Sequence, residues 1–466
     1  MEKKDIKELT RRDFLKIAGA GAVLTGAALA GCKPRNKVSA EGGALGDVPT
    51  DKMEYRVNHN TSDKVSLLGY GCMRWPMRKT SGGGEEVDQD AVNELIDYAI
   101  GHGVNFFDTA PPYVRGWSET ATGKALKRHP RDKFFVCTKL STHRGAELQT
   151  FQGSRALYEK SFKDLQVDYI DYYLLHNIGI SGMQGLMQRF YDNGMLDFLI
   201  KERIAGRIRN LGWTFHGDVK CFDYLLAQQD ERKVLWDAVM IQLNYYDWKY
   251  ATGMNTPAEY LMGELEKRNI QAIVMEPLLG GRLARVNRQG LKLLKETHPE
   301  DSAAKWAFRY AGSHPNVLTV LSGMTYLEHL QENIRTYSPL ERLNGPEYEV
   351  LEQVAEILND SNYIQCTECQ YCMPCPYGLD IPGIFRHYNI IVSEEKRLKS
   401  SKDPNYDKYR REFLVGYDRA VPKLRQASQC NSCGRCKPDC PQRLDIPKEM
   451  LRVDKYAEQL KQKMEF

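Results

Sequence analysis

The sequence lacks a long apolar run beyond its N-terminus, and it lacks a large excess of charge. A membrane-spanning helix needs about twenty consecutive apolar residues, so none is expected after the first thirty residues. The formal net charge is +4. Residues 1–31 hold six Lys or Arg and four Asp or Glu, so +2 of this charge lies there. The remainder has no basic excess that would indicate nucleic acid as a partner.

The N-terminus reads TRRDFLKIAGAGAVLTGAALAGC, in which Arg11 and Arg12 precede a short apolar run that ends at Cys32. This run is too short and too weakly apolar for a permanent membrane span. The segment resembles a twin-arginine (Tat) export signal, and LAGC at 29–32 resembles a bacterial lipoprotein box. The resemblance implies a periplasmic protein whose membrane contact is a lipid on Cys32. An attached N-terminal amphipathic helix is the alternative.

Cysteine is abundant, with 12 residues, and eight of them form two sets near the C-terminus. The last cysteine of each set precedes a proline. Spacings of two residues suit metal ligation better than disulfides, so a metal site is expected, and structural zinc is one alternative. Three other cysteines, Cys72, Cys137 and Cys221, are expected to be core thiols. The two sets are Cys366, Cys369, Cys372 and Cys375, and Cys430, Cys433, Cys436 and Cys440.

The second set has the C-x2-C-x2-C-x3-C-P spacing of bacterial ferredoxins, and the first is one residue shorter before its last cysteine. In two-cluster ferredoxins the fourth cysteine binds the other cluster. The resemblance therefore implies two 4Fe–4S clusters, with Cys375 and Cys440 exchanged between the sets. CPYGLDIP at 375–382 returns as CPQRLDIP at 440–447, and the residues between the sets have helical patterning. This region resembles the α-helical ferredoxins. An unfolded export route would expose bare thiols to oxidation, whereas the Tat route is understood to move proteins that have already folded.

From Val65 onward, short apolar runs alternate with amphipathic helical patterns, for example at 90–102, 151–165 and 259–268. Eight such units predict an α/β fold, a parallel eight-stranded β/α (TIM) barrel with its chemistry at the C-terminal ends of the strands. The expected strands are 65–71, 104–108, 134–139, 169–176, 208–214, 238–244, 272–276 and 317–323.

The strand ends carry a distinctive set of polar residues. Asp108 ends a strand in FFDTAPPYVRG, Tyr113 follows in the next loop, and Lys139 and His176 end the next two strands. This quartet resembles the catalytic residues of the aldo-keto reductases, and the likeness runs from about Val65 to Thr336. It implies that Tyr113 supplies a proton as a carbonyl is reduced, and accepts one in the reverse reaction. Lys139, held by Asp108, is expected to lower the Tyr113 pKa, and His176 to orient the carbonyl.

The same resemblance implies a nicotinamide site, with NAD or NADP as the cofactor. The pyrophosphate loop corresponds to Pro277–Leu283, but Tyr326, His329 and Phe215 stand where many members have other residues. Aromatic residues expected near this face could stack on a sugar ring or only cover the barrel: Trp75, Trp117, Trp213, Tyr245, Tyr246 and Trp248. The expected cofactor contacts are Thr214, Gln242, Gly323, Thr325, Glu332 and Asn333.

Together these features predict an exported oxidoreductase that acts on a small carbonyl or alcohol. The expected divisions are a signal at 1–31, a tether at 32–55, a barrel at 56–340 and a helical two-cluster domain at 341–466. A rival interpretation is an electron-transfer or structural iron–sulfur protein with an idle barrel. The clusters could serve the barrel, another redox partner or only the stability of the C-terminal region. No flavin motif is evident, and no feature names the substrate.

Overall fold

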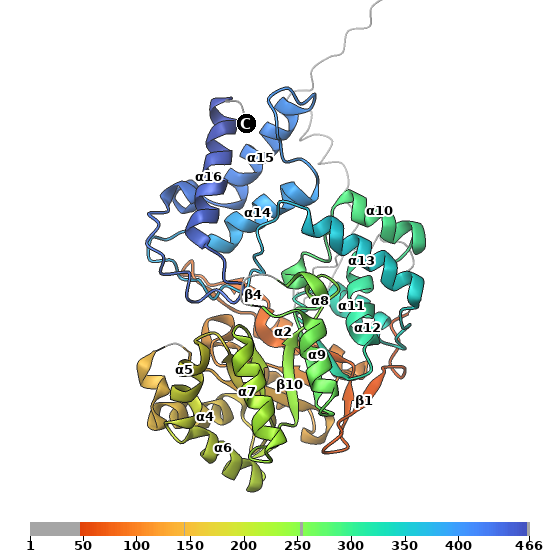
Figure 1. Cartoon of the computed structure of the whole chain (residues 1–466), viewed down its shortest axis with the longest axis vertical. Coiled ribbons are helices and arrows are strands. Elements are labelled where there is room, and N and C mark those ends of the chain that lie inside the picture. Colours follow the sequence, from red (N-terminus) through yellow and green to blue (C-terminus); the bar gives the residue numbers. More distant parts are fainter. Residues whose placement is uncertain (1–46, 144, 252–254, 464–466) are drawn as a thin grey trace, which may run out of the picture. The chain divides into compact units, whose positions relative to one another are not determined.

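The computed structural model describes residues 47–143, 145–251 and 255–463 (Figure 1). The predicted export signal, with Arg11, Arg12 and Cys32, lies outside these residues, as does most of the predicted tether. None of the helices in the described ranges combines the length and apolar character needed to cross a lipid bilayer.

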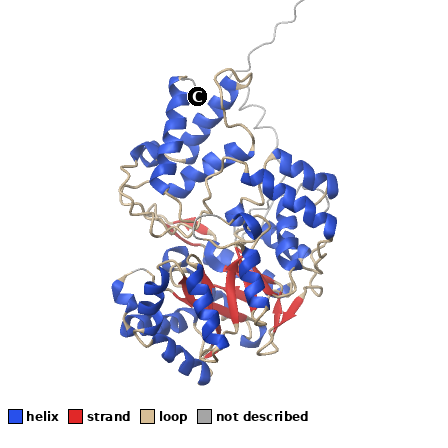
Figure 2. Ribbon diagram, in the orientation of Figure 1, coloured by secondary structure: helices blue, strands red, loops and turns tan. Residues whose placement is uncertain are grey.

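Eight parallel strands close into a barrel, in the order β3-β6-β7-β8-β9-β10-β11-β12 and back to β3, with helices around it (Figure 2). The predicted eight-stranded barrel is therefore confirmed. The boundaries of its strands differ from the expected ones by a few residues. The strands are β3 (Leu68–Gly71), β6 (Phe106–Asp108), β7 (Phe135–Leu140), β8 (Ile170–Ile178), β9 (Ile208–Phe215), β10 (Ala238–Gln242), β11 (Gln271–Met275) and β12 (Val317–Ser322).

The chain expected as one strand at 65–71 is divided in two. β2 (Lys64–Ser66) pairs antiparallel with β1 (Tyr55–Val57), and β3 begins after Leu67. Just beyond β1, the Asn58 side chain donates hydrogen bonds to Tyr172 Oη at 2.9 Å and Asn210 Oδ1 at 3.2 Å. Tyr172 and Asn210 belong to β8 and β9, so the β1–β2 hairpin covers the N-terminal end of the barrel. A second hairpin, β4 (Met77–Lys79) with β5 (Glu85–Val87), follows β3.

The barrel helices begin and end where the local sequence favours it. α4 starts after Thr150, whose side chain accepts a hydrogen bond from Gly153 N, and it ends at Gln166 in the left-handed region. α13 begins with a capping box between Asn344 and Glu347. The α-helices are α2 (Gln89–Gly101), α3 (Ser118–Leu126), α4 (Phe151–Leu165), α5 (Gly182–Leu186), α6 (Met195–Ile204), α7 (Val219–Asp230), α8 (Asp247–Tyr250), α9 (Ala258–Glu266), α10 (Arg288–Thr297), α11 (Ala303–Ser313), α12 (Leu327–Thr336) and α13 (Gly345–Asn359).

The barrel strands are buried on both faces, as a parallel sheet surrounded by helices requires. All nine residues of β8 are buried. The interior contains bulky side chains, including Phe106, Tyr172 and Met240, packed with the thiol of Cys137. Cys72 and Cys221 are also buried, so the three scattered cysteines are core thiols, as predicted.

The C-terminal region is mainly helical, and its three main helices are α14 (Ile381–Ser393), α15 (Tyr406–Ala420) and α16 (Ile446–Gln462). The repeated LDIP sequence explains two of their starts. Asp380 caps α14 by accepting a hydrogen bond from Gly383 N, and Asp445 caps α16 by accepting one from Lys448 N. Each helix has a proline in its first turn, where no backbone N–H partner is lost. The predicted helical domain is therefore confirmed, and each set of cysteines leads into a capped helix.

Candidate active site

The four predicted catalytic residues meet at the C-terminal end of the barrel. Lys139 Nζ donates to Asp108 Oδ1 and Oδ2 at 2.7 and 2.8 Å, and to the Thr109 carbonyl oxygen at 2.8 Å. Its three N–H donors therefore all have acceptors. Nζ also lies 4.7 Å from the centre of the Tyr113 ring. All of these residues are buried, so the ion pair lies directly beneath the phenol.

His176 also adjoins the phenol, with its ring edge-on to Tyr113 and the ring centres 6.1 Å apart. Its Nδ1 hydrogen-bonds Ser141 Oγ at 2.5 Å. Burial, together with nearby charges that include Lys139, lowers the His176 pKa well below its usual value. The imidazole is therefore neutral at physiological pH. Ser141, which the sequence did not indicate, holds its orientation.

The expected lowering of the Tyr113 pKa is not found. Burial raises this pKa well above its ordinary value, and the Asp108 carboxylate raises it further. The reason is that Lys139 is bound by both oxygens of Asp108, so its positive charge is offset where it would act on the phenol. Tyr113 is consequently protonated at neutral pH.

A cavity of about 700 Å³ opens above this quartet and is lined by all four of its members. Thr214 lines it too, as do four of the other predicted cofactor contacts: Gly323, Thr325, Glu332 and Asn333. Gln242 differs, because it is buried beside the cavity. Its amide nitrogen donates to Asp247 Oδ2 at 2.5 Å, and its carbonyl oxygen accepts from Gln442 Nε2 at 3.3 Å.

The upper wall of this cavity comes from the cysteine segments. Thr367 O accepts a hydrogen bond from Arg74 Nη2 at 3.0 Å. The backbone of Thr367 also packs on Gly280, where an added Cβ would lie 2.4 Å from Thr367 Cα. Gly280 has a φ of +66°, which favours glycine as well. The cavity is therefore bounded by both the barrel and the C-terminal domain, with these residues of the latter lining it: Cys366, Thr367, Glu368, Cys369, Tyr371, Arg386, Asn389, Ile390, Ser393, Pro441 and Gln442.

A buried carboxyl group also faces the cavity. Glu276 follows β11, and its Oε2 accepts a hydrogen bond from Gly280 N at 2.6 Å. Burial raises its pKa to about 7, although the positive charge of Arg74 opposes the shift. In the sequence, Glu276 is the last residue of an expected strand, just before the pyrophosphate loop, and no motif indicated a role for it.

The eight clustered cysteines are brought together in two groups that cross between the segments. Burial raises the Cys366 pKa, and the thiols of Cys369, Cys372 and Cys440 raise it further. The Cys436 pKa is raised by burial and then by Cys430, Cys433 and Cys375. Cys440 thus neighbours the first set and Cys375 the second. None of the eight forms a disulfide within the described part of the chain.

No three His, Cys, Asp or Glu side chains in the described ranges are arranged to hold a single metal ion. A zinc site would require such convergence on one point. A 4Fe–4S cluster binds each of its four thiolates to a different iron, so the two cysteine groups suit clusters better.

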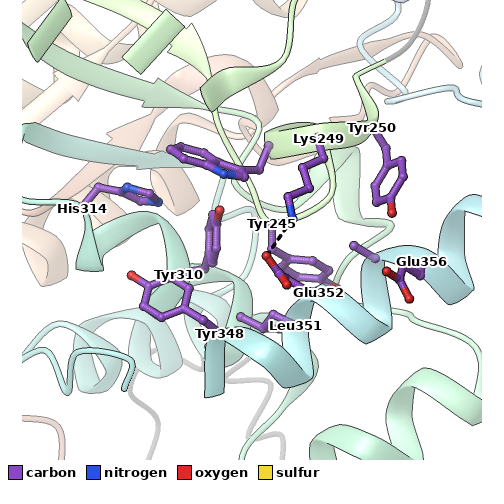
Figure 3. Close-up of a pocket in the computed structure, with 11 residues that line it drawn as sticks. Tyr245, Lys249, Tyr250, Tyr310, His314, Tyr348, Leu351, Glu352 and Glu356 are labelled. Carbon is purple, nitrogen blue, oxygen red and sulfur yellow. Dashed lines mark hydrogen bonds and ion pairs between the residues drawn. The ribbon is translucent and has the colours of Figure 1, made fainter. Parts of the chain in front are cut away.

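None of the six aromatic residues noted in the sequence lines the catalytic cavity. Tyr245 and Trp248 instead line a second cavity of about 290 Å³, shown in Figure 3. There Trp248 stacks on His314, with ring centres 4.8 Å apart. Lys249 pairs with Glu352 at 2.9 Å across α8 and α13, the dashed contact in the figure. These aromatics therefore pack α11 and α13 against the barrel.

Comparison with known proteins identifies both regions. The model of the aldo/keto reductase family matches residues 67–356, and that of the 4Fe-4S dicluster domain matches residues 365–446. The chain is 27% identical over 326 residues to the L-galactose dehydrogenase of Arabidopsis thaliana, covering 66% of this chain and 95% of the relative. It is 33% identical over 153 residues to the aldo-keto reductase YhdN of Bacillus subtilis, covering 31% of this chain and 45% of that relative.

The fold comparison agrees with these matches. The holo form of aldo-keto reductase AKR11C1 from Bacillus halodurans aligns with a TM-score of 0.52 and 22% identity, covering 65% of this chain and 96% of that structure. Since the family match spans more than half of the chain, the protein is an oxidoreductase that belongs to the aldo/keto reductase family and carries a 4Fe-4S dicluster domain after its barrel.

Proposed function

We propose that this protein interconverts a small carbonyl compound and its alcohol, with Tyr113 as the proton donor in reduction and the proton acceptor in oxidation. The observation that carries this proposal is that Tyr113 contacts both the Lys139–Asp108 ion pair and the neutral His176, and that all four residues line one cavity. A proton donor within reach of the reacting oxygen is what carbonyl reduction requires.

Each residue has a separate task in this reaction. Tyr113 is protonated at neutral pH because its pKa is raised, so it can donate as negative charge develops on the carbonyl oxygen. Lys139 stabilises the tyrosinate that remains, because its ammonium group lies close to the ring. His176 orients the substrate oxygen. When the Ser141 hydroxyl donates to Nδ1, Nε2 carries the proton and can donate to that oxygen.

The residues around the cavity fit a nicotinamide dinucleotide, NAD or NADP, which would supply or accept the hydride. In the loop predicted to hold the pyrophosphate, Arg282 has two buried guanidinium nitrogens, Nε and Nη2, without hydrogen-bond partners among the described residues. Its Nη1 donates to Gln365 Oε1, and the two remaining buried donors suit an anionic phosphate. Arg74 and Arg386 line the same cavity. Thr214, Gly323, Thr325, Glu332 and Asn333 would hold the remainder, with Gln242 beside them.

The two cysteine groups fit two 4Fe–4S clusters, which would supply single-electron transfer. We assign Cys366, Cys369, Cys372 and Cys440 to one cluster, and Cys375, Cys430, Cys433 and Cys436 to the other. Because Cys366 and Cys369 line the catalytic cavity, the first cluster would lie beside the reaction site. This position favours a role in the barrel's redox reaction over a purely structural role. A separate redox partner would then meet the second group, in which Cys433 is exposed.

For the substrate, we propose a small carbonyl or alcohol of the sugar type. Support comes from the relative that is an L-galactose dehydrogenase, at 27% identity. The catalytic cavity contains polar groups that could bind hydroxyls, among them His216, Glu276 and Gln442.

We also propose that the protein is exported by the Tat route and anchored as a periplasmic lipoprotein through Cys32. The support is the sequence motif alone, Arg11-Arg12 followed by LAGC. Folding before export would allow the clusters to be assembled in the cytoplasm.

A comparison of Tyr113→Phe with the wild type tests the central proposal. Loss of the proton donor should reduce carbonyl turnover by roughly 100-fold or more, while the iron content stays the same. If the variant retains wild-type turnover, Tyr113 is not the proton donor. If the wild type reduces no carbonyl in a broad screen of sugars and aldehydes, the rival interpretation of an idle barrel is favoured.

A further inference from the structure

Tyr371 reaches from the first cysteine segment to the catalytic residues that line the cavity. It lies between Cys369 and Cys372 in the sequence, yet only 9% of its surface is exposed. Its ring packs with Ala110 and Tyr113, and Cys369 packs against the same group. One residue of the C-terminal domain therefore belongs to the catalytic site.

The Tyr371 hydroxyl contacts the two groups that the proposed reaction needs for the substrate oxygen. It lies 3.4 Å from His176 Nε2, and it also hydrogen-bonds the Tyr113 side chain. A carbonyl oxygen bound by both groups would need the same position. Two oxygen atoms cannot share it, so substrate binding and this placement of Tyr371 exclude each other.

The backbone that carries Tyr371 is in an uncommon conformation. Glu368 and Gln370, on either side of Cys369, have φ values of +55° and +64°. Such left-handed conformations of residues other than glycine are costly and are retained where the surroundings impose them. At the start of the segment, the contacts of Thr367 with Arg74 and Gly280 hold the chain on the barrel. The segment is thus anchored before the residue that enters the site.

We propose that the Tyr371 hydroxyl occupies the position of the reacting oxygen in the resting site and that the substrate displaces it. Tyr371 then determines which carbonyl compounds or alcohols bind, because each must provide an oxygen that replaces its two hydrogen bonds. This inference rests on the proposed function, since it takes Tyr113 and His176 as the groups that bind the substrate oxygen. It also connects substrate binding to the segment that carries Cys369 and Cys372.

The test measures binding without turnover. The dissociation constant of 4-nitrobenzyl alcohol is determined by anaerobic calorimetry for the wild type, Tyr371→Phe and Tyr371→Ala, with no nicotinamide added. Phenylalanine retains the ring and removes the hydroxyl that the probe must otherwise displace. The probe should therefore bind about fivefold more tightly, a change that corresponds to the net free energy of about one hydrogen bond. Tyr371→Ala should bind at least as tightly as Tyr371→Phe.

The matched control is Tyr377→Phe, because Tyr377 belongs to the same cysteine segment but is 49% exposed. It should bind the probe as the wild type does. Iron content is measured for every variant, and Tyr371→Phe decides the outcome if the alanine variant does not fold. Unchanged or weaker binding by Tyr371→Phe with full iron content contradicts the proposal, as does an absence of binding to a folded Tyr371→Ala.

Turnover by the same variants distinguishes this inference from the proposed function. Displacement predicts a lower KM in Tyr371→Phe with little change in kcat. If kcat falls instead while binding is unchanged, Tyr371 is a catalytic group and the displacement model is wrong. If Tyr113→Phe retains its turnover, the assignment of the proton donor fails, whatever Tyr371 does to binding.

Discussion

Lys139 donates hydrogen bonds from Nζ to both carboxylate oxygens of Asp108, at 2.7 and 2.8 Å, in a fully buried site. Breaking a buried ion pair leaves an uncompensated charge, which is strongly unfavourable. The pairing therefore fixes the position of Lys139 beneath the Tyr113 ring. It also limits how far the ammonium group can lower the Tyr113 pKa before substrate binds.

The first prediction concerns Asp108→Asn. The neutral amide leaves the positive charge of Lys139 uncompensated and removes the negative charge that raises the Tyr113 pKa, so that pKa should fall. Tyr113 is a proton donor only below its pKa. The decline in carbonyl reduction at alkaline pH should therefore begin at a lower pH than in the wild type. The measurement is kcat against pH with 4-nitrobenzaldehyde. Asp132→Asn, at an exposed position, is the control. If kcat of Asp108→Asn declines at the same alkaline pH as kcat of the wild type, the prediction is contradicted.

The second prediction concerns the crossed cysteine groups. The wild type should hold about eight irons per chain, and Cys375→Ser or Cys430→Ser should each reduce this to about four. Because both cysteines are assigned to one cluster, combining these changes should cause no further loss. Combining Cys375→Ser with Cys440→Ser should remove nearly all iron. Anaerobic iron and sulfide analysis measures this, with the buried core thiol variant Cys221→Ser as control.

A different result would identify the error. If Cys375→Ser with Cys430→Ser removes nearly all iron, the two cysteines serve different clusters and the crossed assignment is wrong. Zinc in place of iron would contradict the cluster assignment itself.

The third prediction concerns pH and stability at Glu119. Glu119 belongs to α3. Its side chain is buried and accepts a hydrogen bond from Thr138 Oγ1 at 2.6 Å. Burial raises its pKa from 4.5 to about 7. The folded state then binds more protons than the unfolded state between these values, so stability falls as pH rises through that range. Glutamine does not titrate. As the pH rises from 4.5 to 8, the free energy of unfolding of Glu119→Gln should therefore increase relative to that of the wild type, by up to about 3 kcal/mol.

Anaerobic denaturant unfolding at several pH values measures this difference. Glu94→Gln, at an exposed position on α2, should show almost no pH-dependent difference. A constant difference between Glu119→Gln and the wild type across this range would show that Glu119 is not the titrating group.

The fourth prediction concerns export. Replacing Arg11 and Arg12 together by lysine should keep the protein in the cytoplasm, and Cys32→Ala should release it from membranes. Cell fractionation followed by immunoblotting measures both. Lys16→Arg, a conservative change in the same segment, is the control and should fractionate as the wild type. Unchanged fractionation of both test variants would contradict the export proposal.

The sequence by itself determined the barrel, because the spacing of apolar residues and the residues that form turns are local properties of the chain. Alternating apolar strands and amphipathic helices predicted all eight strands, and α4 was predicted with its observed limits of Phe151 and Leu165. The repeated LDIP sequence was evident as a repeat, and the structure shows that each copy supplies the Asp cap and the first-turn proline of a helix. The cysteine spacing and the order of Asp108, Tyr113, Lys139 and His176 indicated the two matched families, since these residue types recur at fixed intervals.

Only the tertiary structure decided how these parts act on one another. Tyr371 is separated from His176 by nearly two hundred positions, and no local pattern distinguishes it from the exposed Tyr377. The same is true of Gln442, which bonds Gln242, and of Ser141, which orients His176. The protonated state of Tyr113 also depends on burial and on the Lys139–Asp108 pair. Burial and long-range contact are properties of the folded chain, because they arise only when distant segments exclude water together.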